Sequence, residues 1–400
     1  MRILHTSDWH LGRSFHREGM LDHQAAYVDH LLEVIATEQV DLVVLSGDVY
    51  DRALPPVDAV RLANETFTRI AKSRADLVVT SGNHDSAMRL GFGAELMDSA
   101  GVFVRTRASS VGRPVLVDDA HGPVAVYGLP YLDPDHVREP WQLAGRSHEA
   151  ALSEAMRRVR ADLASRWPGT RSVVMAHAFV AGNLGADSQS SISESPISQS
   201  DSERDISVGG VSMVPTDVFD GIDYTALGHL HGRHTLTDSI RYSGSPLAYS
   251  FSESTHLKGS WLVDLDASGL STAEFIEAPV PRRLARLRGE IDTLLTDPAL
   301  AVDEDAWVQV TLTDPLRPAG AMDRLRERFP HALVLSFEPD GGPHPGLRTI
   351  RPEPGKSDHA IALDFVSELR GRPASGEEAA LLLDACDSCS PDHDLDQEVS

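Results

Sequence analysis

Apolar residues along the first 130 positions alternate between short uninterrupted runs and longer stretches in which they recur every three or four residues. The short runs have the length of buried strands, and the longer stretches have the period of amphipathic helices. Strands are predicted at residues 3–4, 42–45 and 77–80, and helices at residues 22–38, 57–72 and 88–99. Strands and helices in alternation predict an α/β fold, in which helices cover a layered sheet.

The same kind of pattern continues to residue 278, and we assign residues 1–278 to one domain. Further strands are predicted at residues 115–117, 124–127, 173–176, 224–227, 240–242 and 261–265, and a long helix at residues 148–166. Residues 183–203 differ, because they are rich in Ser and have few bulky apolar side chains. We expect this segment to be a mobile surface loop.

Beyond the Pro-Val-Pro sequence at 279–281, the pattern changes. A compact second domain is predicted at residues 282–338, with strands at 284–290, 307–312 and 332–337 and helices at 291–295 and 319–329. A Gly- and Pro-rich linker (339–356) leads to a helical hairpin (357–386) and an acidic tail (387–400). The hairpin helices, 359–369 and 376–385, have too few apolar positions to form a core alone. Such a hairpin usually packs on a partner.

Length and charge set limits on the function. The chain has 400 residues, 41% of them hydrophobic, which is enough for a large core. Its net charge of -24 argues against a surface that attracts nucleic acid everywhere. Eight acidic residues and no Lys or Arg lie within residues 373–400, so this segment supplies a third of the excess. Bound divalent ions would neutralise part of the remainder.

Nothing in the sequence predicts a membrane or secreted location. There is no apolar span of the ~18 residues that a membrane helix requires, and the first residues lack a signal-peptide pattern. The two cysteines, Cys386 and Cys389, exclude a disulfide framework, and we expect a cytoplasmic protein. Their spacing fits half of a metal site or an intermolecular link. Because the chain has no second pair, we favour an incidental pair in the tail.

Polar side chains that could bind metal or take part in catalysis stand at the ends of five predicted strands. They are Asp8 and His10, then Asp48, then Asn83 with His84 and Asp85, then His177, and finally His229 and His231. Each group alone has an ordinary alternative, because Asp after Gly and the sequence Gly-Asn-His-Asp also form turns and helix caps. Strand ends share one edge of such a sheet, however, so five groups together favour a common site.

The types of side chain indicate which ions would bind. Two Asp, one Asn and four His are predicted as ligands, with no Cys among them. Oxygen and imidazole donors suit Mn, Fe, Zn or Mg rather than a metal selected by thiolates. Seven ligands exceed the need of one tetrahedral ion, which predicts two ions that share a carboxylate. Two such ions can clamp a phosphoryl group and activate water, so the predicted chemistry is phosphoester hydrolysis.

The order D-x-H, G-D-x-x-D, G-N-H-D, H and G-H-x-H resembles that of the calcineurin-like metallophosphoesterases. The opening sequence MRILHTSDWHLG narrows the resemblance to the SbcD family, the nuclease subunits of bacterial SbcCD complexes. The stretches GDVYD at 47–51, RDI at 204–206, YTALGH at 224–229 and RYSGSP at 241–246 match as well. The resemblance runs from residue 1 to about residue 385, without most of the Ser-rich loop.

The resemblance implies a role for each site residue. Asp8, His10 and His231 would hold one metal ion, Asn83, His177 and His229 the other, and Asp48 would bridge the two. His84 would contact the substrate phosphate and protonate the leaving 3′ oxygen, with Asp85 orienting its ring. Archaeal and eukaryotic relatives have a second phosphate-contacting His where this chain has Asp51. The role of that second His is therefore left without an assigned residue.

The resemblance also implies a substrate and partners. Two divalent ions, Mn above all with Mg, Fe or Zn as alternatives, would support cleavage of DNA ends and hairpins in repair, recombination and replication. The second domain would cap the nuclease site, and the basic run at 282–288 would contact phosphate or form a solvated strand edge. The hairpin would bind an SbcC-like ATPase. The helices after Asp48 and Asp85 would form a homodimer contact or simply pack on the core.

Two other functions are compatible with the metal motifs of the sequence. The chain could be another metallophosphoesterase, such as a cyclic-nucleotide phosphodiesterase or a protein phosphatase, which shares the metal motifs. Such an enzyme has no need of a cap domain and an apolar hairpin. Alternatively, the chain could be a scaffold subunit that has lost catalysis. The complete set of competent residues argues against that alternative.

Overall fold

The computed structural model describes residues 1–181, 213–340, 356–370 and 372–388. The chain divides into two units, Met1–Ala285 and Arg286–Ser400. The predicted Ser-rich loop, most of the predicted linker and most of the acidic tail lie outside the described residues. Among the described residues, no helix is long and apolar enough to cross a membrane.

The first unit contains two six-stranded sheets. The first sheet has the order β16 (Gly269–Glu277), β15 (Gly259–Asp266), β1 (Arg2–Thr6), β4 (Leu42–Ser46), β5 (Asp76–Thr80) and β6 (Val102–Arg105). Strands β1, β4, β5 and β6 run parallel, and β15 and β16 extend the sheet antiparallel. Leu4 of β1 pairs with Val43 of β4, which pairs with Leu77 of β5.

The second sheet has the order β13 (His234–Thr235), β14 (Ile240–Tyr242), β12 (Tyr224–Gly228), β9 (Arg171–His177), β8 (Gly122–Gly128) and β7 (Val115–Asp119). Its four central strands, β14, β12, β9 and β8, run parallel. The register places Gly228, the last residue of β12, opposite His177, the last residue of β9. Two short pairs lie outside these sheets: β2 (Ser14–Phe15) with β3 (Glu18–Gly19), and β10 (Val180–Ala181) with β11 (Val214–Pro215).

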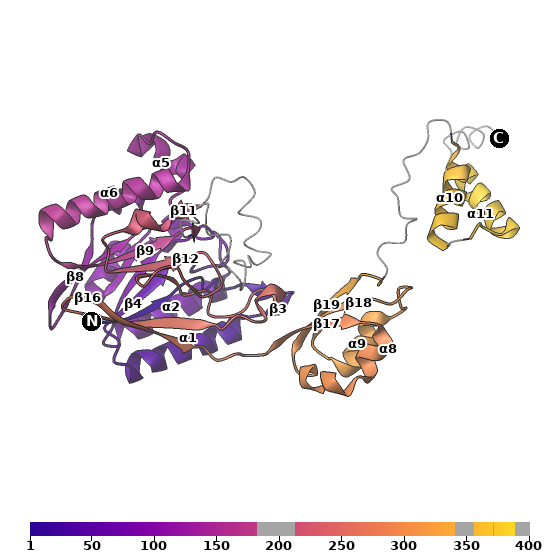
Figure 1. Ribbon diagram of the computed structural model, residues 1–400, viewed down its shortest axis with the longest axis horizontal. Helices are drawn as coiled ribbons and strands as arrows, with labels where there is room; N and C mark the ends of the chain where they lie inside the picture. Colours follow the sequence, from indigo (N-terminus) through magenta and orange to yellow (C-terminus); the bar gives the residue numbers. More distant parts are fainter. Residues whose placement is uncertain (182–212, 341–355, 371, 389–400) are drawn as a thin grey trace, which may run out of the picture. The chain divides into compact units, whose positions relative to one another are not determined.

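The two sheets pack face to face, and helices cover their outer faces (Figure 1). Helices α1 (Leu21–Thr37) and α2 (Val57–Ala71) lie on the first sheet, and α6 (His148–Arg166), with α5 (Pro134–Trp141) beside it, lies on the second. Alternate residues of a strand face opposite ways, and this separates the cores. On β4, Val43 faces the helices, whereas Val44 faces the other sheet.

The helices follow from the apolar spacing in the sequence. In α1, Tyr27, Leu31, Val34 and Ile35 are buried at intervals of three and four residues, which gives the helix one face toward the sheet. Helix α6 has the predicted bounds and begins where the Ser147 hydroxyl accepts a hydrogen bond from Ala150 N–H at 3.1 Å. The predicted α/β fold class is confirmed.

One predicted helix is interrupted. Instead of a single helix over residues 88–99, the structure has α3 (Ala87–Leu90), α4 (Ala94–Met97) and a 3-10 turn, η1 (Asp98–Ala100). Gly91 and Gly93 separate the first two. Gly93 has a left-handed backbone (φ 73°), and a Cβ on Gly91 would lie 2.5 Å from Thr106 Oγ1. The glycines therefore allow a turn and a close approach that a continuous helix would not make.

Among the longer elements of the first unit, β6, β16 and α5 were not predicted from the sequence, and neither were the two-residue strands β2, β3, β10, β11 and β13. The edge strand β16 has mostly polar, exposed or half-buried residues, so it lacks the apolar run of a buried strand. The remaining 3-10 turns are η2 (Ala108–Ser110), η3 (Thr216–Phe219), η4 (Phe251–Glu253) and η5 (Pro298–Asp303).

The third sheet has the order β17 (Leu284–Gly289), β18 (Trp307–Leu312) and β19 (Ala332–Phe337), with helices α8 (Ile291–Thr296) and α9 (Ala321–Arg328). Leu294 of α8 and Leu325 of α9 are buried. Farther along the chain, α10 (Asp358–Arg370) and α11 (Gly376–Ser388) form the helical hairpin. The ring of His359 in α10 hydrogen-bonds to the carbonyl of Ala379 in α11 at 2.9 Å.

Candidate metal centre

Every predicted site residue lies at or just after the carboxyl end of a parallel strand. Strands β1, β4 and β5 are neighbours in the first sheet, and β9 and β12 are neighbours in the second. The residues are Asp8 and His10 after β1, Asp48 after β4, Asn83, His84 and Asp85 after β5, His177 at the end of β9, and His229 and His231 after β12. The strand ends of one sheet share an edge, and the contacts below join the edges of both sheets.

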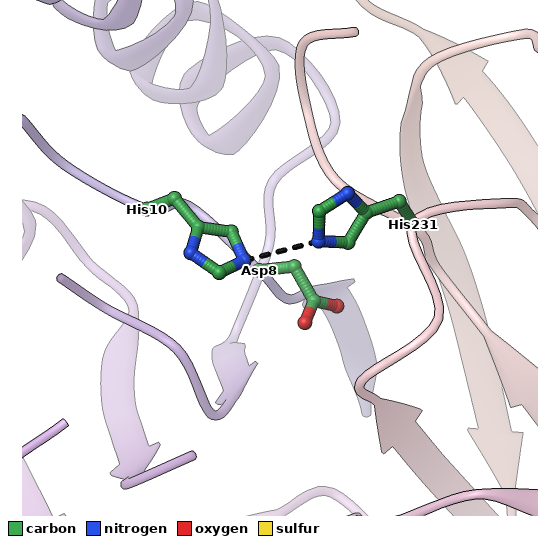
Figure 2. A group of neighbouring side chains, drawn as sticks. All are labelled: Asp8, His10 and His231. Carbon is green, nitrogen blue, oxygen red and sulfur yellow. Dashed lines mark hydrogen bonds between the residues drawn. The ribbon is translucent and has the colours of Figure 1, made fainter. Parts of the chain in front are cut away.

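Asp8, His10 and His231 form the first group, and all three are buried. Figure 2 shows the rings of His10 and His231 facing one another from two distant segments, with Asp8 beside them. The two Nε2 atoms are 3.1 Å apart. Two imidazole nitrogens at this distance need a proton or a cation between them, because two lone pairs facing each other repel.

Asn83, His177 and His229 form the second group. The amide oxygen of Asn83 lies 3.0 Å from His177 Nε2 and 3.2 Å from His229 Nδ1. Asp48 stands between the two groups, because its Oδ2 is 3.3 Å from His177 Nε2 and 3.6 Å from His10 Nε2. The structure therefore brings together all seven residues predicted as ligands.

Four of these residues have a left-handed backbone, which residues other than Gly rarely adopt. They are Asp8 (φ 53°), His10 (φ 45°), Asp48 (φ 47°) and His229 (φ 107°). Strain of this kind costs of order 1–3 kcal/mol per residue and gathers at functional sites. The surrounding sheets must impose this geometry, because the chain would not adopt it locally.

Two glycines let the loops approach closely enough to form the site. A Cβ on Gly82 would lie 2.1 Å from Asp48 Oδ1 and 2.4 Å from the Asp48 backbone nitrogen. A Cβ on Gly47 would lie 2.2 Å from His177 Nδ1, and Gly47 also has a left-handed backbone (φ 82°). Any side chain at either position would displace a predicted ligand.

Burial and neighbouring charges shift the pKa values of the site. Burial lowers the pKa of His229 to about 3 and that of His10 well below its ordinary value, so both rings are neutral. Burial also raises the pKa of Asp8 to about 6, although the nearby His177 opposes it. Burial alone would lower the pKa of His177, but Asp48 and Asp8 outweigh it and raise that pKa to about 9.

These shifts suit a cationic ligand. Burial would raise the pKa of Asp48, but the charge of His177 and its hydrogen bond to Asp48 outweigh burial and hold the pKa below its ordinary range. Asp48 is thus ionised and His10 and His229 are neutral, which are the forms that bind metal, whereas His177 would release a proton on binding an ion. Buried carboxylates with imidazole and amide oxygen form a donor set for divalent ions such as Mn, Fe, Zn or Mg.

His84 lies beside the metal centre and is half-buried. Its Nδ1 donates to the backbone carbonyl of Asp51 at 2.9 Å, and its ring lies 4.8 Å from the ring of His10, measured between centroids. A carbonyl can only accept, so Nδ1 carries the proton and Nε2 is available to a substrate. His84 also belongs to a group with His10 and Asp48 whose side chains could hold an ion.

Asp85 does not make the expected contact with the His84 ring. Its Oδ2 accepts from the N–H groups of Val49 and Gly82, both at 3.0 Å, and its Oδ1 accepts from Tyr50 N–H at 2.9 Å. Burial and the nearby Asp48 raise its pKa to about 6. Asp85 therefore ties the loop after β5 to the loop after β4, and the carbonyl of Asp51 holds the His84 ring.

Asp51, which stands where relatives have a second His, faces two neighbours. Its Oδ1 lies 3.7 Å from His10 Nδ1 and 3.6 Å from Arg13 Nη1. His10 Nδ1 is buried and has no hydrogen-bond partner among the described residues. Asp51 is thus placed beside a predicted ligand rather than among the ligands.

Two buried residues beside His231 were not predicted from the sequence. Glu253 Oε1 accepts a hydrogen bond from His231 Nδ1 at 3.4 Å, and Lys258 forms an ion pair with Glu253. Burial would raise the pKa of Glu253, but Lys258 and His231 outweigh it and lower the value to about 2. No spacing or composition in residues 250–258 distinguishes these side chains, since only the folded chain brings them to His231.

Two known protein families match parts of this chain. Residues 1–233 match the family described as calcineurin-like phosphoesterase. That match spans more than half of the chain, so the chain belongs to this family of metal-dependent phosphoester hydrolases. Residues 280–351 match the SbcD_C family, described as the type 5 capsule protein repressor C-terminal domain. Together, the two matches support an SbcD-type nuclease, as the sequence resemblance implied.

Two solved structures match part of this chain at low sequence identity. The crystal structure of TT1561 from Thermus thermophilus is 15% identical, with a TM-score of 0.39, over 69% of this chain and 98% of that chain. A structure titled as a novel archaeal phosphodiesterase is 12% identical, with a TM-score of 0.29, over 69% of this chain and 100% of that chain. Neither score is high enough to bear on function.

Proposed function

We propose that this chain is a manganese-dependent DNA nuclease, the nuclease subunit of an SbcCD-type complex. Its activities are 3′ to 5′ exonuclease action on duplex ends and endonuclease action on single strands or hairpins, in DNA repair, recombination and replication. The observation that supports this most is the position of Asp48, whose Oδ2 lies within 3.6 Å of a ligand nitrogen in each group. A shared carboxylate between two ligand groups is typical of two-metal phosphodiesterases.

Within this proposal, Asp8, His10 and His231 hold one ion and Asn83, His177 and His229 the other, with Asp48 shared. The ions supply Lewis-acid activation of a phosphoryl group and of a water molecule. The backbone fixes the ligands before an ion arrives, because Asp8 accepts from His229 N–H at 3.0 Å and Asp48 accepts from His84 N–H at 2.9 Å. The first contact links loops of the two sheets, and the second links two loops of the first sheet.

His84 acts as the proton donor to the leaving 3′ oxygen. The Asp51 carbonyl fixes its Nδ1–H, which leaves Nε2 as the atom that carries or releases the exchangeable proton. Asp85 contributes by holding the loop that carries His84, through three backbone N–H groups. Asn83 and His84 are adjacent in the sequence but have different roles in this proposal: Asn83 binds metal, and His84 transfers a proton.

Contacts with DNA are proposed for the basic run that leads into β17. Arg286 is exposed and makes no ion pair with a described residue, whereas Arg288 pairs with Glu338 at 2.8 Å and Asp340 at 3.1 Å. A free guanidinium suits a phosphate contact better than a paired one. Arg288 is therefore a weaker candidate for a phosphate contact than the sequence suggests, and Arg286 is the better candidate of the two.

The helical hairpin is proposed to bind an SbcC-like ATPase. Phe365 of α10 and Leu381 of α11 are 52% and 70% exposed, although both are large apolar side chains. An apolar surface on a small helical pair favours docking on another helix or coiled coil. The acidic residues Glu377 and Glu378 at the start of α11 add to its amphipathic character.

A homodimer is proposed through the helices that follow the metal loops. Val57 of α2, Met88 of α3 and the nearby Phe92 and Leu96 are between 73% and 86% exposed. Arg89 of α3 donates to the carbonyl of Ala53 at 3.0 Å, so α3 lies beside the loop that leads into α2. Large apolar side chains that are this exposed, on segments that lie close together, favour a protein contact.

The proposed activity is tested by measuring hydrolysis of end-labelled linear duplex DNA and of a cyclic nucleotide, each with Mn. We expect nucleotides to be released from 3′ ends, and no hydrolysis after chelation. Hydrolysis of the cyclic nucleotide with DNA left intact would contradict a nuclease and favour another phosphodiesterase. If every DNA substrate stayed intact even with the ATPase partner present, the scaffold alternative would replace the proposal.

A further inference from the structure

A buried ion pair lies behind one of the predicted metal ligands. Glu253 in η4 is 1% exposed, and Lys258, which precedes β15, is 7% exposed. Neither residue is among the predicted ligands. Burying two charges is expensive, and apolar residues of similar size often stabilise a protein equally well. The pair therefore needs an explanation other than stability.

The pair holds His231 at both its side chain and its backbone. Glu253 Oε1 accepts from His231 Nδ1 at 3.4 Å, while Oε2 pairs with Lys258 Nζ. Lys258 also donates to the His231 carbonyl at 2.8 Å and to Ser245 Oγ at 2.9 Å. One buried cation thus connects the backbone of residue 231 to the carboxylate that contacts its ring.

The carboxylate determines which nitrogen of His231 can bind an ion. Glu253 accepts, so it favours the tautomer in which Nδ1 carries the proton and Nε2 has a free lone pair. Nε2 is the atom that lies 3.1 Å from His10 Nε2, in the group with Asp8. A hydrogen bond to a carboxylate also makes the ring a stronger ligand than a hydrogen bond to a neutral group.

No such hydrogen bond between the second ring nitrogen and a carboxylate is made by the other predicted histidine ligands in the described structure, although Asp51 Oδ1 lies 3.7 Å from His10 Nδ1. His177 Nδ1 lies 3.0 Å from the neutral carbonyl of Ser46, and His10 Nδ1 has no hydrogen-bond partner among the described residues. His229 approaches Asn83 through Nδ1 itself. His231 is therefore the predicted ligand whose second nitrogen hydrogen-bonds to a carboxylate in the described structure.

We propose that Glu253 is a positioning residue that fixes the tautomer and orientation of His231 as a metal ligand, and that Lys258 holds Glu253 in place. This inference rests on the proposed metal role of His231. Glu253 itself contacts neither ion nor substrate, and its effect passes through the His231 ring. Loss of Glu253 should therefore weaken the ion held with Asp8 and His10 and spare the ion held by Asn83 and His177.

The test compares Mn affinity, measured by calorimetric titration of metal-free full-length protein, with stability, measured by urea unfolding of the same samples. Glu253→Gln keeps the size of the side chain and removes its charge. We expect one of two Mn sites to weaken by about 10- to 100-fold, with the other site unchanged. Unchanged affinity at both sites would overturn the inference.

Two further variants distinguish the proposed role of Glu253 from a general effect on stability. Asp119→Asn breaks another largely buried ion pair, with Arg171, at the opposite end of β9 from His177, so it should lower stability and leave both Mn affinities as they are. The double variant Glu253→Gln with Lys258→Met removes both charges, so its stability should recover while the weak Mn site stays weak. If its Mn affinity recovered together with stability, Glu253 would act on the fold alone.

A measurement without metal completes the test. Histidine-selective 15N spectra of the metal-free protein should show His231 with its proton on Nδ1, and a mixture of tautomers in Glu253→Gln. The same mixture in the wild type would contradict the role of Glu253. If the wild type bound no Mn at all, the proposed metal centre itself would be contradicted. If the wild type bound Mn normally and Glu253→Gln bound it equally well, only the proposed role of Glu253 would be contradicted.

Discussion

At the scale of single residues, the site depends on side chains that the backbone holds in uncommon conformations. Asp8, His10, Asp48 and His229 all have positive φ angles, and Gly47 and Gly82 sit where any Cβ would meet a predicted ligand. Ligands held this way are preorganised, because little conformational entropy is lost when an ion binds. The cost of this strain is met by the packing of the two sheets.

His84 and Asp48 should respond to substitution in different ways. His84→Gln keeps all seven predicted ligands, so metal content should stay intact while nuclease activity falls by about 10²- to 10⁴-fold, the usual contribution of a positioned acid. Asp48→Ala removes the carboxylate between the two groups and should lose metal itself. Metal analysis and a DNA cleavage assay on both variants check this. Full activity of both variants would show that the site is assigned wrongly.

Gly82→Ala tests the close approach of the loops after β4 and β5. The new Cβ would lie 2.1 Å from Asp48 Oδ1, so the carboxylate or the loop must move. We expect weaker Mn binding and a loss of about 1–3 kcal/mol in the free energy of unfolding, as for other overpacked sites. Gly19→Ala is the matched control, since nothing lies within 4 Å of a Cβ there. Equal Mn affinity in the two variants would refute the steric argument.

At the scale of elements, the ends of the site strands could be predicted from the sequence, because each of these strands is an apolar run that ends in polar residues, in some cases after a Gly. Asp48 after Gly47 and Asn83 after Gly82 are examples. The parallel order of β1, β4 and β5 then places these ends at one edge, which sequence alone can predict for such a fold. The calcineurin-like fold class and the family were therefore accessible before the structure.

Other features were not accessible, because they depend on residues that are distant in the sequence. Glu253 and Lys258 meet His231 only in the folded chain, and Asp51 holds the His84 ring through a carbonyl that any residue would supply. The helix predicted over 88–99 breaks because Gly91 must approach Thr106 on another segment. Apolar periodicity predicts local structure only, so it cannot predict these contacts, which join residues that are distant in the sequence.

The pair of Asp119 on β7 and Arg171 on β9 fixes the strands at the end opposite the metal centre. Arg171 donates to both carboxylate oxygens, at 2.9 and 2.5 Å, and to the carbonyls of Gly122 and Asp266 at 2.8 and 3.1 Å. The hydrogen bond from Arg171 lowers the pKa of Asp119 below its ordinary value of 3.8. Asp266 ends β15, so this pair also connects the two sheets.

Asp119→Asn should lower the free energy of unfolding by about 1–3 kcal/mol at pH 7, because this half-buried carboxylate makes charge-assisted hydrogen bonds to Arg171 and also pairs with the N-terminal amine of Met1. A carboxyl with a depressed folded pKa stabilises above its unfolded pKa, and this contribution is lost as the pH falls. The difference between wild type and variant should therefore be smaller at pH 3 than at pH 7. Urea unfolding at both pH values checks this, and a difference that grew toward acid would contradict the assigned pair.

At the scale of the whole molecule, the charge of -24 and the proposed DNA substrate are compatible. Part of the acidity lies in the last 28 residues, and part lies in the metal centre, where bound ions would neutralise it. Binding of DNA would then depend on local groups such as Arg286 and on the ions rather than on the net charge. The exposed apolar surfaces point to protein partners in addition.

The exposed side chains of Phe92 and Leu96 allow the proposed homodimer to be tested. Replacing both with Asp puts two charges into the surface and should convert a dimer into a monomer, with metal content unchanged. Leu316→Asp is a control, because Leu316 is similarly exposed, at 79%, but lies in the other unit. Sedimentation velocity distinguishes the states. A wild-type monomer, or a variant that stays dimeric, would exclude this contact.

Anomalous diffraction from Mn-soaked crystals tests the central claim, a dinuclear metal centre formed around Asp48, most directly. We predict two anomalous peaks about 3.5–4 Å apart, one beside Asp8, His10 and His231 and one beside Asn83, His177 and His229, with Asp48 contacting both. Crystals of His84→Gln should show the same two peaks. Absence of peaks among these residues, or a single ion that does not touch Asp48, would contradict the account.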